Sequence, residues 1–371
     1  MVCSAQAATA QEAAPAEGGG YLIIHAEAVA DDLPVLDLSG DWSRGYKDGG
    51  GGRTALISGR AEAGFWFDGL GPWRTPGEAY RLGALARVDG TARLSGDAAR
   101  FLKAYQSKED PPPYTYDASI NAQTWVGTGW TLTVPVCTDT GGRWCASLTW
   151  DQMRLKRLRT IETAGIVQYL SDGTYAFRMR AYDNDSRTQE PFLAAPGSSG
   201  TGSSFSLSMR WRQAHDEQTS TWVPSEVSVR VNDAWSRLHW PGMITNTATI
   251  NSDTSQRDAS GYINIQPLIQ GRYARETVTE RIAMTSSVHA RWQAPDNSQW
   301  QLTVQHRDQL WQTWLGWQGG SSWRPLIALE PERRALKLGA SWSGVDAVLW
   351  ADQVDRAANL LGLQLQGRWA W

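Results

Sequence analysis

The chain has 371 residues, a formal net charge of −3, 36 Gly and 21 Trp. No block of basic residues is present, which argues against a nucleic-acid partner. No stretch approaches the roughly 18 consecutive apolar residues that a membrane-spanning helix needs. So many Trp rings require burial sites, or a membrane interface that offers acyl chains to the ring and water to its N–H. Composition alone therefore leaves a soluble Trp-rich β-sandwich and a membrane barrel open.

The start of the chain is small and Ala-rich, and we interpret residues 1–20 as a signal-peptide remnant and linker. Ala8-Thr9-Ala10 has the A-x-A form of a signal-peptidase site. The basic and apolar regions that normally precede such a site are missing, so an ordinary Ala-rich tail is the alternative. Residues 21–371 are predicted to form one barrel domain.

Alternating apolar and polar residues follow through most of the chain. In "TALISGRAEAGFWF" (54–67), Ile57 and Phe65 share one face while Arg60 and Glu62 share the other. The segments 80–96 and 204–213 repeat this pattern. A soluble antiparallel sheet also alternates in this way. Repeated Arg on the polar faces and aromatic residues at the ends of the apolar faces favour a water-filled lumen and interfacial girdles.

The connections between these segments predict about sixteen strands. Compact turns such as "TDTGG" (138–142), "SDG" (171–173) and "PDNS" (295–298) alternate with long links at 97–119 and 241–279. Short periplasmic turns and long outer loops alternate in this way in bacterial barrels. Residues 151–170 fit one long strand or two short ones, so fourteen is the second count.

The last strand, "LLGLQLQGRWAW" (360–371), alternates as regularly as any other. From about Leu36 to its end, the chain resembles a Gram-negative outer-membrane β-barrel of porin-like size, and this strand resembles the terminal recognition signal of that class. The class usually ends on Phe, so the final Trp is a departure. The resemblance implies an all-β, closed antiparallel transmembrane barrel in the outer membrane, with the lipid bilayer and the barrel-assembly machinery as partners. The residues that carry the signal are Leu363, Leu365, Trp369 and Trp371.

Two cysteines flank a short predicted hairpin. Cys137 and Cys145 both fall on inward positions, where cross-strand side chains lie close, so we expect a disulfide in the oxidising periplasm. Free thiols are the alternative. The five His have no metal-ligand spacing and no nucleotide or phosphate motif is present, so neither metal nor cofactor is expected.

The polar faces would form the functional surface of a barrel. An excess of cations there favours anions, whereas Arg paired with acids would only stiffen the wall. The predicted pore-lining residues are Arg60, Glu62, Arg81, Arg87, Asp89, Arg93, Arg178, Arg180, Arg210, Arg212, Arg230, Arg291, Arg324, Lys337 and Arg368.

The pattern predicts a passive channel for small hydrophilic, anionic solutes rather than an enzyme. Channels, exporters, enzymes and adhesins share barrel patterning, so alternatives stay open. One is a structural or export barrel gated by its loops or by a periplasmic partner. Another is a lipid hydrolase at the membrane rim, built on Ser286 and His306, although no group that would orient the His is apparent.

Overall fold

One antiparallel sheet closes on itself in the computed structural model of the chain. The structure describes residues 18–35, 42, 46–70, 73–74, 79–137, 143–190, 193, 199–213, 223–252, 255–257, 263–265, 268–320, 323–355 and 357–370. The predicted all-β barrel class is confirmed. No helix within these ranges is long and apolar enough to cross a bilayer.

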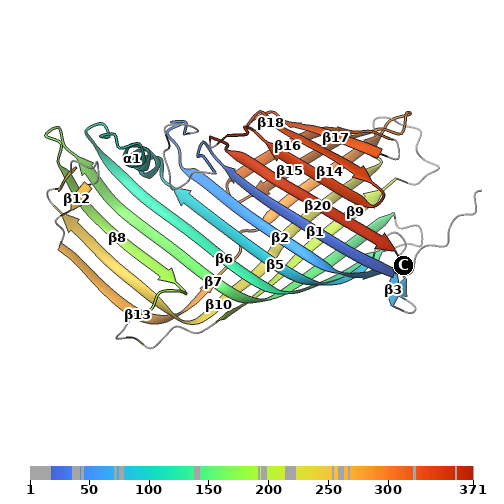
Figure 1. Cartoon of the computed structure of the whole chain (residues 1–371), viewed down its shortest axis with the longest axis horizontal. Coiled ribbons are helices and arrows are strands. Elements are labelled where there is room, and N and C mark those ends of the chain that lie inside the picture. Colours follow the sequence, from blue (N-terminus) through green and yellow to red (C-terminus); the bar gives the residue numbers. More distant parts are fainter. Residues whose placement is uncertain are drawn as a thin grey trace, which may run out of the picture.

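Neighbouring strands of the sheet are antiparallel throughout (Figure 1). The helix α1 (Gly96–Gln106) follows β5, and two hairpins lie outside the sheet: β3 (Gly69–Leu70) with β4 (Trp73–Arg74), and β11 (Ser255–Arg257) with β12 (Ile263–Ile265). The barrel strands are β1 (Gly18–Ala30), β2 (Arg53–Phe67), β5 (Tyr80–Leu94), β6 (Tyr114–Cys137), β7 (Trp144–Tyr169), β8 (Tyr175–Asp185), β9 (Gly200–Arg212), β10 (Glu226–Ser252), β13 (Leu268–Glu280), β14 (Thr285–Gln293), β15 (Gln299–Arg307), β16 (Leu310–Gln318), β17 (Trp323–Glu330), β18 (Ala335–Trp342), β19 (Val345–Ala351) and β20 (Leu360–Ala370).

Sixteen strands make up the sheet, and fourteen of them close the ring. The closed path runs from β1 through β2, β5, β6, β7, β9, β10 and β14 to β20, which pairs with β1. The other two strands, β8 and β13, lie in line with β9 and β14 and extend the sheet toward the end opposite the start of β1 and the end of β20. β8 and β9 pair with successive parts of β7, and β13 and β14 pair with successive parts of β10. The two predicted counts therefore describe the sheet and its closed ring.

The seam between β1 and β20 brings both ends of the described chain together, with Gly19 paired to Ala370. We call this the terminal end of the barrel and the opposite one the far end. Figure 1 shows β1 beginning beside the C-terminus of β20. An even number of strands requires this arrangement, and in outer-membrane barrels the short turns at such an end face the periplasm.

The wall is tall on one side only. β6, β7 and β10 have 24, 26 and 27 residues, whereas β14 to β20 have between 7 and 11. A transmembrane strand needs about 9–11 residues. The long strands therefore extend beyond the bilayer, and Figure 1 shows them projecting at the far end together with α1 and β12.

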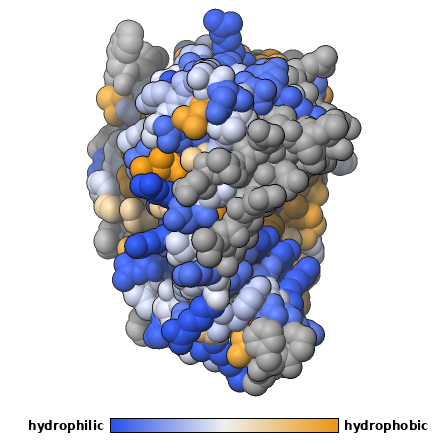
Figure 2. Space-filling view, turned by 90° about the vertical axis from the view of Figure 1, so that its left-hand side faces the viewer, coloured by the Kyte–Doolittle hydropathy of each residue, from blue (hydrophilic) through white to orange (hydrophobic). Residues whose placement is uncertain are grey.

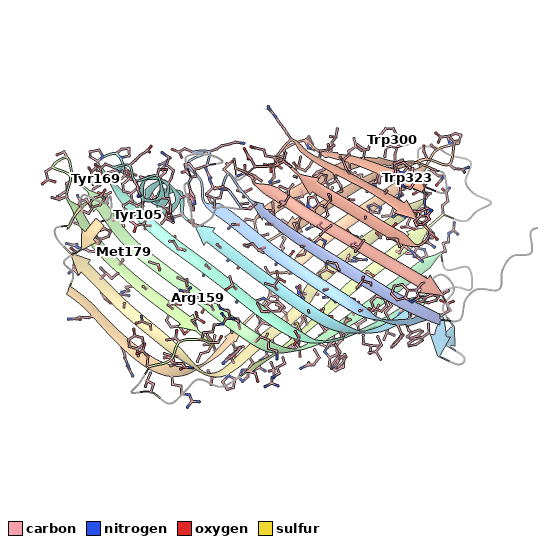
Figure 3. All side chains as sticks on the ribbon, viewed as in Figure 1. Tyr105, Arg159, Tyr169, Met179, Trp300 and Trp323 are labelled. Carbon is pink, nitrogen blue, oxygen red and sulfur yellow. A yellow bond between two sulfur atoms is a disulfide. The ribbon has the colours of Figure 1, made fainter. Side chains whose placement is uncertain are left out.

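Outward positions carry large apolar side chains around the ring, for example Leu82, Leu315 and Leu349, which are 48%, 55% and 60% exposed. Aromatic residues mark the terminal end of this belt, and Figure 3 places Trp300 and Trp323 there. An exposed apolar belt edged by aromatic rings is unfavourable in water and matches the lipid-facing surface of a transmembrane barrel.

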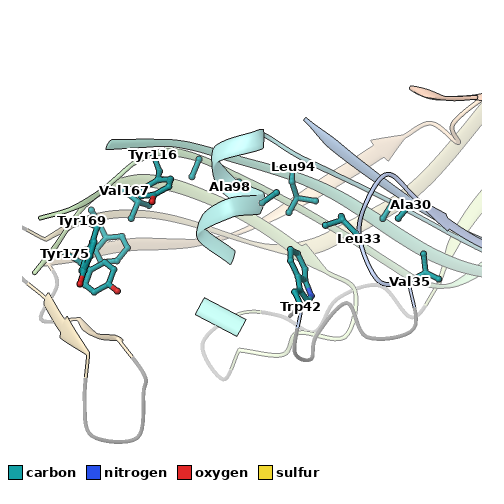
Figure 4. Close-up of a cluster of buried hydrophobic side chains, with 14 of the residues drawn as sticks. Ala30, Leu33, Val35, Trp42, Leu94, Ala98, Tyr116, Val167, Tyr169 and Tyr175 are labelled. Atoms are coloured by element: carbon teal, nitrogen blue, oxygen red, sulfur yellow. The ribbon is translucent and has the colours of Figure 1, made fainter. Parts of the chain in front are cut away.

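The helix α1 packs on the outward face of the tall side, as Figure 4 shows. Ser95 caps its N-terminus, because its Oγ accepts from Ala98 N at 3.1 Å. Ala98 is buried with Leu94 and Tyr116, which share the outward face by alternation. At the surface, Arg100 donates to Asp48 at 3.0 Å, and this hydrogen bond holds the pKa of the carboxyl below its ordinary value. Figure 2 shows that the described surface of the far end is mainly hydrophilic.

The expectations for three connections are wrong. Residues 97–119 contain α1 and the start of β6, and residues 241–279 mostly continue β10 and β13 as paired strands. The turn at 171–173 lies at the far end, because β7 is one long strand. Above the bilayer both faces of a strand can meet water, so the apolar alternation that identifies membrane strands is weak there.

The first strand also departs from expectation. β1 begins at Gly18, inside the segment interpreted as a linker, and its run "YLIIHAEAVA" (21–30) obscures the alternation because Tyr21 and Ile23 are apolar on the inward face. The strand expected near Leu36 lies outside the described residues apart from Trp42, and so does the signal-peptide interpretation of residues 1–17.

The structure joins Cys137 to Cys145 by a disulfide across the β6–β7 hairpin, with 4.1 Å between the Cα atoms. Cys137→Ser/Cys145→Ser is expected to lower the free energy of unfolding by about 2–3 kcal/mol, because the open chain regains the entropy of a short closed loop. Urea unfolding of the barrel in lipid vesicles measures this change. Wild-type protein treated with a thiol reductant is the control, and equal stability of the oxidised and reduced forms would contradict the prediction.

Candidate functional site: the barrel interior

Inward side chains form an ionic network at mid-height in the lumen. Arg60 of β2 donates to Asp151 of β7, from Nη1 at 2.5 Å and from Nη2 at 3.0 Å. Its Nε donates to Glu62 on the same strand. Asp151 is 1% exposed, so its charge is removed from water and depends on this guanidinium.

A second arginine links more distant strands. Arg87 of β5 donates with both terminal nitrogens to Asp233 of β10, at 2.8 and 2.6 Å, and to Asp89 at 2.9 Å. Arg307 of β15 donates to the other oxygen of Asp89. Along the ring, β6, β7, β9, β10 and β14 separate β5 from β15. The contact between Arg307 and Asp89 therefore joins opposite sides of the barrel.

Simple alternation predicts that most side chains of this network face the lumen. Asp233 faces the lumen only because its strand is irregular. The odd residues Val227, Val229 and Val231 face outward, so a regular strand would direct Asp233 outward as well. The register of β10 shifts between Val231 and Trp235, where Asp233 has a φ of 54°. A β-bulge re-aims a side chain in this way. Sequence reasoning missed Asp233 for that reason, and it also missed Arg307, which is the last residue of β15.

Apolar side chains fill the lumen on both sides of the network. On the tall side, Trp125, Leu155 and Trp240 are at most 2% exposed. On the short side, Trp314 and Trp350 pack with Leu56. Side chains buried to this degree leave little room for water between them. At mid-height the interior is therefore packed rather than an open aqueous pore, which corrects the expectation of a continuously water-filled lumen.

The terminal-end mouth of the lumen is rich in arginine. Arg212 donates to Glu226 at 2.7 Å, and Arg291 lies 3.7 Å from the same carboxylate. Arg368 lies over the Trp66 ring at 3.7 Å. Seven of the predicted pore-lining residues face the lumen at this mouth. They are Arg81, Arg210, Arg212, Arg230, Arg291, Arg324 and Arg368.

Lys337 belongs to a different environment. Its ammonium lies 4.1 Å from the Trp314 ring centroid and 4.8 Å from that of Trp350. Trp350 Nε1 and Gln312 Nε2 each donate to Glu27 at 3.3 Å. The lysine therefore lies between aromatic faces inside the short half of the barrel, where cation–π attraction stabilises it.

The far end opens into a vestibule with a volume of about 580 Å³. Its lining includes Arg93, Arg180, Asn121 and Glu162. Arg93 also donates to Asp308, in the turn between β15 and β16, at 2.6 Å. Arg178 lies on the same inward face of β8, two residues from Arg180 and outside the cavity lining.

The two residues weighed for lipid hydrolysis face outward near the far end of the belt. Ser286 and His306 occupy directly paired positions on β14 and β15. The imidazole centroid lies 4.3 Å from that of Trp311 with the rings tilted by 34°, and among the described residues no carboxylate or amide hydrogen-bonds to it. Within the same ranges, no three His, Cys, Asp or Glu side chains are arranged to hold a metal ion. This pair lacks the third group that orients a catalytic His.

Comparisons with known proteins give only distant similarities. No protein-family model and no curated protein matches the sequence. A TodX deltaS2S3 mutant monoaromatic hydrocarbon channel is 8% identical, with 96% of this chain and 90% of that chain covered and a TM-score of 0.39. The toluene transporter TodX of Pseudomonas putida is 9% identical, with 96% and 88% covered and a TM-score of 0.32. The alcaligin outer-membrane receptor FauA of Bordetella pertussis is 9% identical, with 94% and 76% covered and a TM-score of 0.13. Similarity at this level assigns neither a family nor a substrate to this chain.

The chain's own architecture defines its class. The closed ring satisfies its backbone hydrogen bonds between strands, and the outward belt is apolar with aromatic edges. The protein is an outer-membrane β-barrel of the Gram-negative type.

Proposed function

We propose that this protein is a passive outer-membrane channel for small hydrophilic anions, closed at mid-height in the conformation described above. The observation that carries the proposal is the excess of arginine at the terminal-end mouth, where Arg210, Arg230 and Arg324 face the lumen. A cationic mouth bounded by a low-dielectric wall concentrates anions and repels cations.

The closing contacts suggest how an anion opens the path. Arg87 holds Asp233, and Arg307 holds Asp89, so these two pairs connect opposite parts of the wall. A carboxylate or phosphate that enters from the arginine-rich mouth offers Arg87 an alternative partner. This exchange breaks the Arg87–Asp233 link while the Arg87 guanidinium keeps a counter-charge. Within the part of the chain that the structure describes, the side chains of this closing network come from wall strands, which favours a channel over a loop-gated exporter.

Single-channel recording in a planar bilayer tests the proposal. Under a KCl gradient, we expect discrete openings with a reversal potential displaced toward that of chloride. Arg230→Glu should move the reversal potential toward potassium, because the side chain lies between Ser208 and Ser287 on the lumen face.

Lys103→Glu is the matched control, since it makes the same charge change on α1 outside the lumen. A wild-type reversal potential directed toward potassium, or an Arg230→Glu channel with unchanged selectivity, would contradict anion passage. If wild type and Arg87→Met, which breaks the network, both insert stably but neither conducts, the channel itself is excluded.

A further inference from the structure

The outward face of the tall wall changes from apolar to basic at one level. Four aromatic rings cross β6, β7, β9 and β10 in a row, namely Trp130, Trp150, Phe205 and Trp235, with neighbouring centroids 4.7, 5.9 and 5.6 Å apart. Aromatic rows of this kind mark the boundary between hydrocarbon and head groups. The next outward positions toward the far end are therefore at head-group depth.

Cations occupy the first two outward levels beyond this row, on β7 and β10, with β9 between them. Arg237 is level with Gln152, and Arg154 lies one outward position farther toward the far end. Arg154 points outward because Met153 and Leu155, on either side of it, are buried in the lumen. Arg237 points outward for the same reason, since Ser236 and Leu238 are buried.

The same band continues onto the link between β13 and β14. Glu280 pairs with Leu238, and Ile282 joins the lumen cluster. Arg281 between them therefore faces outward beside Arg237. Lys156, in the register shift of β7, is also exposed. We call Arg154, Lys156, Arg237 and Arg281 the basic band.

These four cations are not neutralised by the nearest acids. Asp183 and Asp185, on the outward face of β8, are engaged by Arg157 and Arg159 at 3.1 to 3.8 Å. Within the described ranges, no member of the basic band forms an ion pair, and all four are exposed. Thr201 pairs with Arg154 and adds an exposed hydroxyl donor. The band is an unneutralised surface that faces the bilayer side of the wall, not the lumen.

We infer that the basic band binds the phosphate groups of the glycolipid that forms the outer leaflet. Arginine forks match phosphate oxygens and form charge-assisted hydrogen bonds with them. The aromatic row directly below offers an apolar surface to the acyl chains of the same molecule. A soluble anion would meet only the charges, whereas a phosphorylated lipid meets both surfaces at once. The inference is independent of what the lumen passes.

Native mass spectrometry of the detergent-solubilised full chain with bisphosphorylated lipid A tests this site. The variant Arg154→Gln/Lys156→Gln/Arg237→Gln/Arg281→Gln should bind more weakly, by roughly fivefold for each cation removed. A control with the same charge change at cations outside the band, Lys47→Gln/Lys103→Gln/Arg187→Gln/Arg334→Gln, should retain wild-type affinity.

Three results would overturn the inference: wild-type affinity in the band variant, equal binding of dephosphorylated lipid A, or displacement of the lipid by millimolar inorganic phosphate. The last would assign the band to free anions. A heat-dependent mobility shift on gels reports whether each variant is folded. If the fourfold variant does not fold, Arg154→Gln and Arg237→Gln are measured singly, each with the expected fivefold loss, and wild-type affinity in both is equally contradictory.

Discussion

Arg87→Met is expected to destabilise the barrel by about 3–5 kcal/mol and to raise its conductance. Asp233 would lose the bidentate partner that holds it at 2.8 and 2.6 Å, while it stays 4% exposed. A buried carboxylate left without its counter-charge has this cost, because desolvation is no longer offset. The same change removes one of the two ionic links that close the lumen, the one between β5 and β10. Urea unfolding in vesicles and planar-bilayer recording measure the two effects.

The double variant Arg87→Met/Asp233→Asn separates the two contributions. It should recover most of the stability, since the unpaired charge is gone, and it should still conduct, since the link is still broken. Asn tolerates the positive φ of this position as well as Asp does. Arg100→Met serves as the control, because it removes an arginine that is also paired with an acid, Asp48, but lies on α1 outside the lumen. A stable and silent Arg87→Met barrel would show that the network neither supports nor closes the lumen.

Gly19→Val is expected to prevent closure of the ring, so that little folded barrel accumulates. A Cβ at this position would collide with the carbonyl oxygen of Trp369 and lie 2.6 Å from Trp66 Nε1. That indole also holds the seam together, because it donates to Gly20 O at 3.1 Å and to Trp369 O at 3.2 Å. Backbone atoms in a strand ladder cannot move aside without loss of pairing.

The measurement is the fraction of heat-modifiable, protease-resistant barrel in outer-membrane preparations. Ala26→Val is the control on the same strand, since Ala26 is exposed on the outward face, where extra methyl groups meet lipid. Wild-type amounts of folded Gly19→Val would show that the close packing of β1 on β20 is not required for closure.

The sequence by itself determined the class of fold and the facing of most side chains. Side chains of a strand alternate between two faces, and in a membrane barrel one face meets lipid while the other meets the lumen. The sequence alone therefore assigned four charged residues to the lumen, namely Arg60, Glu62, Arg87 and Asp89. The terminal strand that resembles an assembly signal was found for the same reason. Leu363, Leu365 and Trp369 face outward on β20, whereas Trp371 lies outside the described residues, and recognition by the assembly machinery stays a prediction.

Only the tertiary structure decided what the inward residues do. Alternation says that Arg87 faces the lumen, but the ring must close before Asp233 and Arg307, from distant strands, are brought to it. The bulge that turns Asp233 inward interrupts the two-residue alternation, and that alternation is what predicts whether a side chain faces lipid or the lumen. The tall wall escaped prediction because water on both faces weakens the apolar signal. The basic band exists only because pairing across β7, β9 and β10 sets cations from separate segments at adjacent levels.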